Sequence, residues 1–232
     1  MRSRVPASWL RARGSHGRRG LAAGRCTDPP GAGAVILAGL TLATLAACGP
    51  VSSASAYSGG QLSDPVPLPA VSLTDTAGTS FELQQRGKGL LTVVYFGYTN
   101  CPDVCPTTMA DLGNAVRKLP VSDRDKVQVV FITTDPQHDT PKLLRSWLNN
   151  FDAGVPRKFV GLSGDLPTVQ GAAKQFGVVA QTPQIGAGGK ITDTHGAQVI
   201  AFSPSDEKAR VIWLPGTKVS DYTHDMSKLL ST

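Results

Sequence analysis

The chain has 232 residues, of which 41% are hydrophobic and 17% charged, and its formal net charge is +6 at pH 7. This composition excludes both a disordered polyelectrolyte and a membrane protein with many spans. The charge is unevenly distributed, because residues 1–47 hold seven arginines and one acidic residue, whereas basic and acidic residues balance in 48–232. The basic excess therefore belongs to the N-terminal segment, and we expect no nucleic-acid partner.

The first 47 residues have the composition of an export signal. An Arg-rich leader precedes an uncharged apolar run at 31–47 (GAGAVILAGLTLATLAA), which is near the lower limit of length for crossing a bilayer. A basic leader followed by an apolar run and small residues is typical of a secretory signal. The run leads into LAAC, which resembles the bacterial lipobox and predicts lipidation of Cys48. An uncleaved membrane anchor and a simple secretory signal are the alternatives.

Three segments are predicted along the chain. They are a lipoprotein-type signal peptide over 1–47, a flexible tether over 48–70 and a single domain over 71–232. The tether is rich in Ser, Gly and Pro and has too little apolar content to become ordered by itself. Two acyl chains on Cys48 are enough for stable anchoring. We therefore expect the domain at the extracytoplasmic face of the cell membrane, held by a lipid anchor.

The domain begins with a short β-hairpin, predicted over 71–73 and 80–83 on either side of a polar turn. Two continuous apolar runs, 90–96 and 127–132, are rich in β-branched and aromatic residues, and they predict strands buried on both faces. Three more strands are predicted from shorter apolar segments, at 159–162, 197–202 and 210–214.

Four helices are predicted between and after these strands, at 106–119, 141–151, 166–176 and 219–230. In the first, Met109, Leu112 and Val116 form one apolar stripe. The second has Thr140 as its N-cap and Pro141 at its first position. Crossover helices early and a hairpin late predict an α/β fold with a central mixed β-sheet flanked by helices. This succession is that of a thioredoxin-like fold.

Two cysteines lie between the first buried strand and its helix, in the segment CPDVCP at 101–106. Their i, i+4 spacing lets the sulfurs of Cys101 and Cys105 face the same side, close enough to share a metal ion or to form a disulfide. The helix N-terminus is expected to lower both thiol pKa values and favour thiolate. A purely structural disulfide is the alternative, although a bridge closing so small a loop constrains the unfolded chain little.

His195 is the third candidate for this site. It lies just before the strand predicted at 197–202, after a Gly-rich loop that the fold brings beside the start of the first helix. Two thiolates and one imidazole suit Cu(I), or Cu(II) with an added ligand, whereas structural zinc usually has a fourth protein ligand. A solvated or capping histidine is the alternative.

Four other polar residues are weaker candidates. We expect His138 to be a solvated turn residue and His224 to lie on the surface of the last helix. Asp103 suits the dipole of the helix start, and a role beside the cysteines is its alternative. Asp135 follows a buried strand, at the edge of the sheet where ligand sites commonly form. A role in a turn or as a helix cap is an equally good interpretation.

The segment at 95–109 (YFGYTNCPDVCPTTM) resembles the Sco/SenC family of copper-binding assembly factors for cytochrome c oxidase. The resemblance continues through FITTDP at 131–136, DTP at 139–141 and VGLSG at 160–164, and it covers about 80–230. It implies a thioredoxin-like fold and a bound copper ion.

The resemblance also implies the ligands, because the two motif cysteines and one later histidine of the family fall on Cys101, Cys105 and His195. One departure concerns the histidine. Family members often have Asp directly before it, whereas here Thr194 separates Asp193 from His195.

Together these features predict a membrane-anchored copper metallochaperone that delivers one ion to the copper centre of cytochrome c oxidase subunit II, with a copper donor chaperone as a further partner. The alternative is a thiol–disulfide oxidoreductase that keeps the oxidase's copper-site cysteines reduced. In that case Cys101 attacks and Cys105 resolves. Whether the protein is an enzyme depends on this choice, and His195 discriminates, because only the copper site needs it.

Overall fold

The computed structural model describes residues 57–181, 184–185, 191–192 and 196–232. The predicted signal peptide, Cys48, the first part of the tether and His195 lie outside these residues. Within the described ranges, no helix has both the length and the apolar character needed to cross a bilayer.

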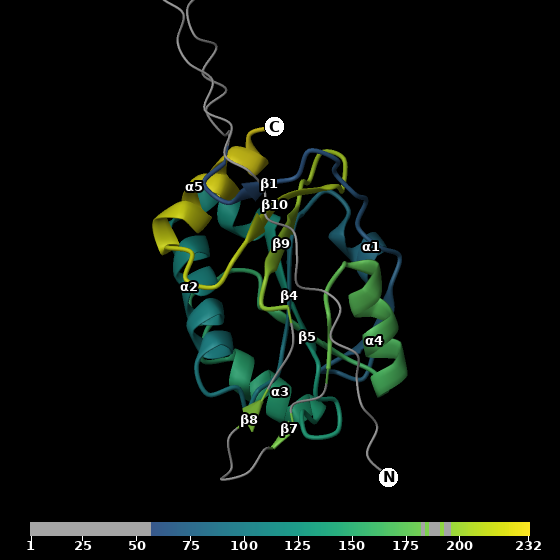
Figure 1. The fold of residues 1–232 in the computed structure, drawn as a ribbon. Coiled ribbons are helices and arrows are strands. Elements are labelled where there is room, and N and C mark those ends of the chain that lie inside the picture. The colour runs from purple at the N-terminus through teal and green to yellow at the C-terminus, as the bar shows by residue number, and fades with distance from the viewer. Residues whose placement is uncertain (1–56, 182–183, 186–190, 193–195) are drawn as a thin grey trace, which may run out of the picture. The chain divides into compact units, whose positions relative to one another are not determined.

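An eight-stranded mixed sheet forms the centre of the domain (Figure 1). Three parallel strands lie inside it and antiparallel strands extend it on both sides. The α/β class, the mixed sheet and the N-terminal hairpin are therefore confirmed. In spatial order the strands are β1 (Gly60–Gln61), β10 (Ala209–Trp213), β9 (Val199–Phe202), β4 (Leu91–Gly97), β5 (Val127–Thr133), β6 (Val160–Ser163), β2 (Ser72–Asp75) and β3 (Ser80–Glu82).

Helices cover both faces of this sheet (Figure 1). One face carries α2 (Val104–Lys118), α3 (Pro141–Leu148) and α5 (Val219–Leu230), and the other carries α1 (Leu83–Gly87) and α4 (Leu166–Gln175). Successive strand residues point to opposite faces, so Tyr95 packs with α2 whereas Phe96 packs with α4. Thr140 caps α3 as predicted, because its hydroxyl accepts a hydrogen bond from the Leu143 amide.

Several short elements were not expected from the sequence: β1, α1, a 3-10 helix η1 (Val121–Lys126), and the separate pair β7 (Gln184–Ile185) with β8 (Ile191–Thr192). Helix α2 begins two residues before the predicted start at 106, and α3 ends three residues before the predicted end at 151. The chain leaves α3 early because Phe151 and Asp152 turn back onto the Leu148 carbonyl.

A flexible tether was predicted over 48–70, but in the structure its second part, residues 57–70, packs on the domain. Gly60 and Gln61 pair with β10, and Leu68 is buried. The carboxylate of Asp225 accepts hydrogen bonds from the amides of Ser58 (2.7 Å) and Gly59 (2.9 Å). The packing of residues 57–70 could not be predicted from composition. Backbone hydrogen bonds to a sheet edge and to a buried carboxylate hold this segment, and such bonds need few apolar side chains.

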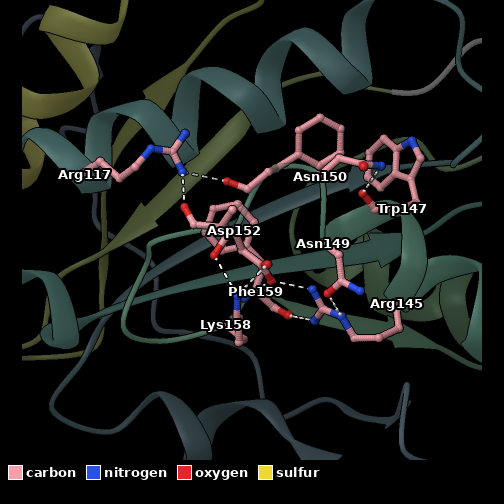
Figure 2. Close-up of polar contacts among 10 residues, drawn as sticks. Arg117, Arg145, Trp147, Asn149, Asn150, Asp152, Lys158 and Phe159 are labelled. Carbon is pink, nitrogen blue, oxygen red and sulfur yellow. Dashed lines mark hydrogen bonds and ion pairs between the residues drawn. The ribbon is translucent and has the colours of Figure 1, made fainter.

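A second buried carboxylate, Asp152, holds the loop between α3 and β6 (Figure 2). Its side chain forms ion pairs with Arg145 and Lys158 and accepts a hydrogen bond from the Phe159 amide at 3.1 Å. Arg117 of α2 donates to the carbonyls of Phe151 and Ala153, at 3.0 and 2.8 Å. These contacts connect α2, α3 and the start of β6.

We predict that Asp152→Asn lowers the free energy of unfolding by about 3 kcal/mol, because it leaves two cations beside a neutral buried side chain. Denaturant titration measures this change. The matched control is Asp206→Asn, which breaks the more exposed ion pair with Arg210 and should cost about 1 kcal/mol or less. Equal losses in the two variants would contradict this account of the loop.

A second prediction concerns pH. Burial raises the pKa of Asp225, but hydrogen bonds from Ser58, Gly59, His224 and Trp213 outweigh it and hold the pKa below its ordinary value. A carboxyl with a lowered folded-state pKa contributes stability above its unfolded pKa, and this contribution is lost as pH falls through the folded pKa. Asp225→Asn should therefore destabilise the protein at neutral pH, and the gap to wild type should narrow below about pH 4. Denaturant titrations at several pH values measure the gap, and a gap independent of pH would contradict the prediction.

Candidate metal centre

The structure brings the two cysteines together where β4 leads into α2. Cys105 is the second residue of α2 and is fully buried, whereas Cys101 precedes the helix and is half-buried. The Cys105 amide donates to Cys101 Sγ at 3.4 Å, and the two side chains are hydrogen-bonded to each other. One sulfur therefore faces the interior and the other lies nearer the surface. Their role as metal ligands stays a prediction.

Gly97, the last residue of β4, makes the burial of Cys105 possible. A Cβ at this position would lie 2.9 Å from Cys105 Sγ and 3.1 Å from the rings of Tyr95 and Phe131. No side chain fits there without moving the sulfur. The Tyr95 hydroxyl donates to Cys105 Sγ at 3.4 Å from the same strand. Strand β4 thus fixes the position of the Cys105 sulfur in two ways: Gly97 leaves room for it, and the Tyr95 hydroxyl is hydrogen-bonded to it.

The expectation of a lowered thiol pKa is wrong for Cys105. Its hydrogen bond to the Cys101 side chain and its burial raise its pKa well above the ordinary value, and these effects outweigh the hydrogen bonds from Tyr95 and Tyr98. Burial likewise raises the pKa of Tyr95, so the phenol stays a donor. The position of Cys105 at a helix N-terminus can be predicted from the sequence, whereas the complete burial of its side chain cannot. Cys105 is therefore a thiol at neutral pH, and a metal ion must displace its proton.

The loop that carries Cys101 is fastened to the loop after β5 by Asp139. This buried carboxylate accepts hydrogen bonds from the Thr99 amide (3.0 Å), the Thr99 hydroxyl and the Thr133 hydroxyl. Burial raises its pKa, and the hydrogen bonds oppose that rise in part. A further bond joins the Thr134 amide to the Gly97 carbonyl at 2.7 Å. Asp139 was not predicted as a functional residue, although a polar segment directly after a buried strand is a signal that could have indicated it.

His138 lies in the same loop and is exposed, as predicted for a turn residue. Its Nδ1 lies 2.9 Å from each carboxylate oxygen of Asp135, and this contact raises the pKa of the imidazole. Asp135 is buried, and its backbone amide donates to the Thr133 hydroxyl at 3.0 Å. His224 is also exposed, as predicted.

The remaining predicted site residues are placed less completely. Asp103 is at the N-cap of α2, but its side chain makes no capping hydrogen bond. His195 is outside the described residues, which resume at Gly196, whose amide donates to the Val179 carbonyl at 3.0 Å. Within the described part of the chain, no group of three His, Cys, Asp or Glu side chains is arranged to hold a metal ion. The described residues bring two sulfur atoms together at this position.

Known proteins that are similar to this chain support the resemblance described from the sequence. The sequence pattern of the SCO1/SenC family matches residues 68–231. An SCO2-like protein of Rickettsia felis is 37% identical over 108 residues, which are 46% of this chain and 49% of that protein. The matched segment thus spans about half the length of this relative.

Two solved structures are similar over most of the domain. Bradyrhizobium japonicum ScoI with copper bound is 30% identical, with a TM-score of 0.59, and the match covers 74% of this chain and 99% of that one. BsSco, described with a disulfide switch as a member of the Sco family of cytochrome c oxidase assembly proteins, is 20% identical, with a TM-score of 0.57. That match covers 74% of this chain and 99% of BsSco, and at this identity it shows the fold alone. The thioredoxin-like fold predicted from the sequence is confirmed.

We predict that Gly97→Ala destabilises the protein by about 1–3 kcal/mol, because the added methyl group must displace the Cys105 sulfur or the Tyr95 ring. Denaturant titration measures the loss. Gly171→Ala in α4 is the control, since a Cβ there meets nothing within 4 Å. It should stabilise the helix by about 0.5–1 kcal/mol. Equal changes in the two variants would mean that the close packing at Gly97 has no energetic weight.

Proposed function

The chain belongs to the SCO1/SenC family, and from this membership we propose that it binds one copper ion and delivers it during assembly of cytochrome c oxidase. The ligands in this proposal are Cys101, Cys105 and His195. The observation that carries it is the pairing of one buried and one half-buried cysteine where β4 meets α2.

The donor set suits copper. Thiolate sulfur is a soft ligand that selects Cu(I), and imidazole binds copper as well. The copper-bound ScoI structure, 30% identical to this chain, supports the same ion here. Three protein ligands hold the ion but leave one side open to incoming donors. The ion can therefore move by ligand exchange, one bond at a time, without first being released to water.

The site residues have distinct tasks in this exchange. Cys105 is protonated when the site holds no metal, so copper binding replaces its proton and releases it to solvent. The Tyr95 hydroxyl orients the Cys105 sulfur at 3.4 Å. Asp139 keeps the loop of Cys101 in place through Thr99. Cys101 is the more exposed of the two cysteines, so a recipient protein contacts it first.

Delivery is to the copper centre of subunit II, at the extracytoplasmic face of the membrane, with lipidated Cys48 as the anchor. Residues 57–70 pack on the domain, so only residues 49–56 are left to connect it to the anchor. A fully extended chain spans at most about 3.5 Å per residue, so this connection reaches about 30 Å at most. The domain therefore acts close to the membrane surface.

Copper titration of the reduced protein and its ligand variants tests the proposal. The wild type should bind one Cu(I). Cys101→Ser and Cys105→Ser should lose this site, and His195→Ala should weaken it by at least about tenfold. His224→Ala is the control and should bind as the wild type does, since that histidine is hydrogen-bonded to Asp225 on α5. Stoichiometric, equally tight copper binding by Cys101→Ser would overturn the site assignment.

The alternative, a thiol–disulfide oxidoreductase, is favoured by one observation. The half-buried Cys101 can attack a substrate disulfide while the adjacent, buried Cys105 resolves the mixed disulfide. His195 separates the two functions. Full complementation of an oxidase-deficient strain by His195→Ala would favour the redox function, whereas failure to complement supports copper delivery.

A further inference from the structure

The loop after β5 carries His138, whose imidazole contacts a carboxylate, as metal-binding histidines commonly do. His138 Nδ1 lies 2.9 Å from both carboxylate oxygens of Asp135, and its side chain is 74% exposed. A carboxylate that accepts the proton of one ring nitrogen fixes the tautomer and leaves the other nitrogen as a lone-pair donor. Asp135 is itself fixed, because it is buried and its amide is hydrogen-bonded to Thr133. The pair therefore presents Nε2 to solvent in a defined orientation.

This histidine lies on the loop that is fastened to the cysteine loop. Its neighbour Asp139 binds the amide and hydroxyl of Thr99, two residues before Cys101. At the start of the same loop, directly after β5, the Thr134 amide donates to the Gly97 carbonyl at 2.7 Å. Both loops thus leave the same edge of the sheet and are joined by several hydrogen bonds.

The burial of Cys105 creates a need for such a ligand. Its sulfur has no exposed surface, so an incoming ion must first bind elsewhere and then pass inward by way of Cys101. An imidazole on the loop that is hydrogen-bonded to the cysteine loop offers an exposed donor for that first contact.

Resting on the copper-binding function proposed above, we propose that His138, oriented by Asp135, is the capture ligand that first binds copper at the surface and transfers it to Cys101. In the transfer the copper–Nε2 bond breaks as a copper–Sγ bond forms, and the Cys101 thiol proton leaves to water. The imidazole regains its lone pair, and copper keeps its oxidation state.

The chain contains a matched control in His224. This histidine is also exposed, and its Nδ1 lies 2.9 Å from Oδ1 of Asp225. Its other contact is with Ser58 of the N-terminal segment, and it lies on α5. Both pairs join an exposed imidazole to a buried carboxylate, but only His138 Nδ1 has both carboxylate oxygens within 2.9 Å, and only His138 lies on the loop joined to the cysteine loop. An effect on copper loading that any exposed histidine produces would appear equally in variants of His138 and of His224.

The first experiment follows Cu(I) transfer from a coloured chelate to the reduced protein at mildly alkaline pH, where imidazole is neutral. His138→Asn should load at least about tenfold more slowly, because it loses the first ligand and loss of even an outer-shell partner typically costs that much. It should reach the same end point as wild type. His224→Asn should load at the wild-type rate. An unchanged rate in His138→Asn overturns the capture role. Failure of the wild type to load at all would instead refute the proposed copper function.

The second experiment removes the cysteines and locates the ion directly. In the Cys101→Ser/Cys105→Ser protein, substoichiometric Cu(II) should broaden the ring NMR signals of His138 before those of His224. Adding Asp135→Asn should reduce this preference, because the imidazole loses its fixed orientation. Parallel broadening of the two histidines would overturn the proposal, and it would do so without any reference to the cysteine site.

Discussion

Strands β4 and β5 run parallel from the pair Leu91–Val127 to the pair Gly97–Thr133, and every residue of both strands is buried. Because parallel strands end at the same edge, this pairing places the loop of Cys101 beside the loop of Asp135 and Asp139. The sheet then needs helices on both faces, and α2 begins after the Cys101 loop that follows β4, with Cys105 in its first turn. The location of the candidate site is thus a consequence of how two apolar strands pair.

Burial at this edge explains the electrostatics of the site. Cys105 and Asp139 both have raised pKa values, the thiol through its hydrogen bond to Cys101 and its burial, and the carboxyl chiefly through its burial. The cost of burying the Asp139 carboxyl is offset by three hydrogen bonds from two threonines. The buried Cys105 side chain needs fewer hydrogen bonds, since a thiol can stay neutral at little cost. The buried sulfur is stable as a thiol and becomes a thiolate when a cation replaces its proton, which suits a site that must both accept and release an ion.

Much of the fold could be predicted because strong periodic signals coincide with its largest elements. The buried runs of β4 and β5 and the apolar face of α5, whose predicted bounds equal the observed ones, depend on local pattern alone. The docked segment at 57–70 and the raised pKa of Cys105 could not be predicted, because each depends on contacts with residues far along the chain. Asp225 binds Ser58 across 167 positions, and Gly97 meets Cys105 only after β4 and α2 have packed. The cysteine pair was visible in the sequence, whereas the polar network that holds it was not.

We propose that Cys101, Cys105 and His195 together bind copper. X-ray absorption spectroscopy of the copper-loaded protein tests this most directly, because it reports the ligand atoms around the metal itself. We expect two sulfur neighbours at copper–thiolate distances and one imidazole nitrogen, with the imidazole contribution lost in His195→Ala and kept in His224→Ala. A first shell of oxygen and nitrogen without sulfur, or an imidazole signal that persists in His195→Ala, would contradict it.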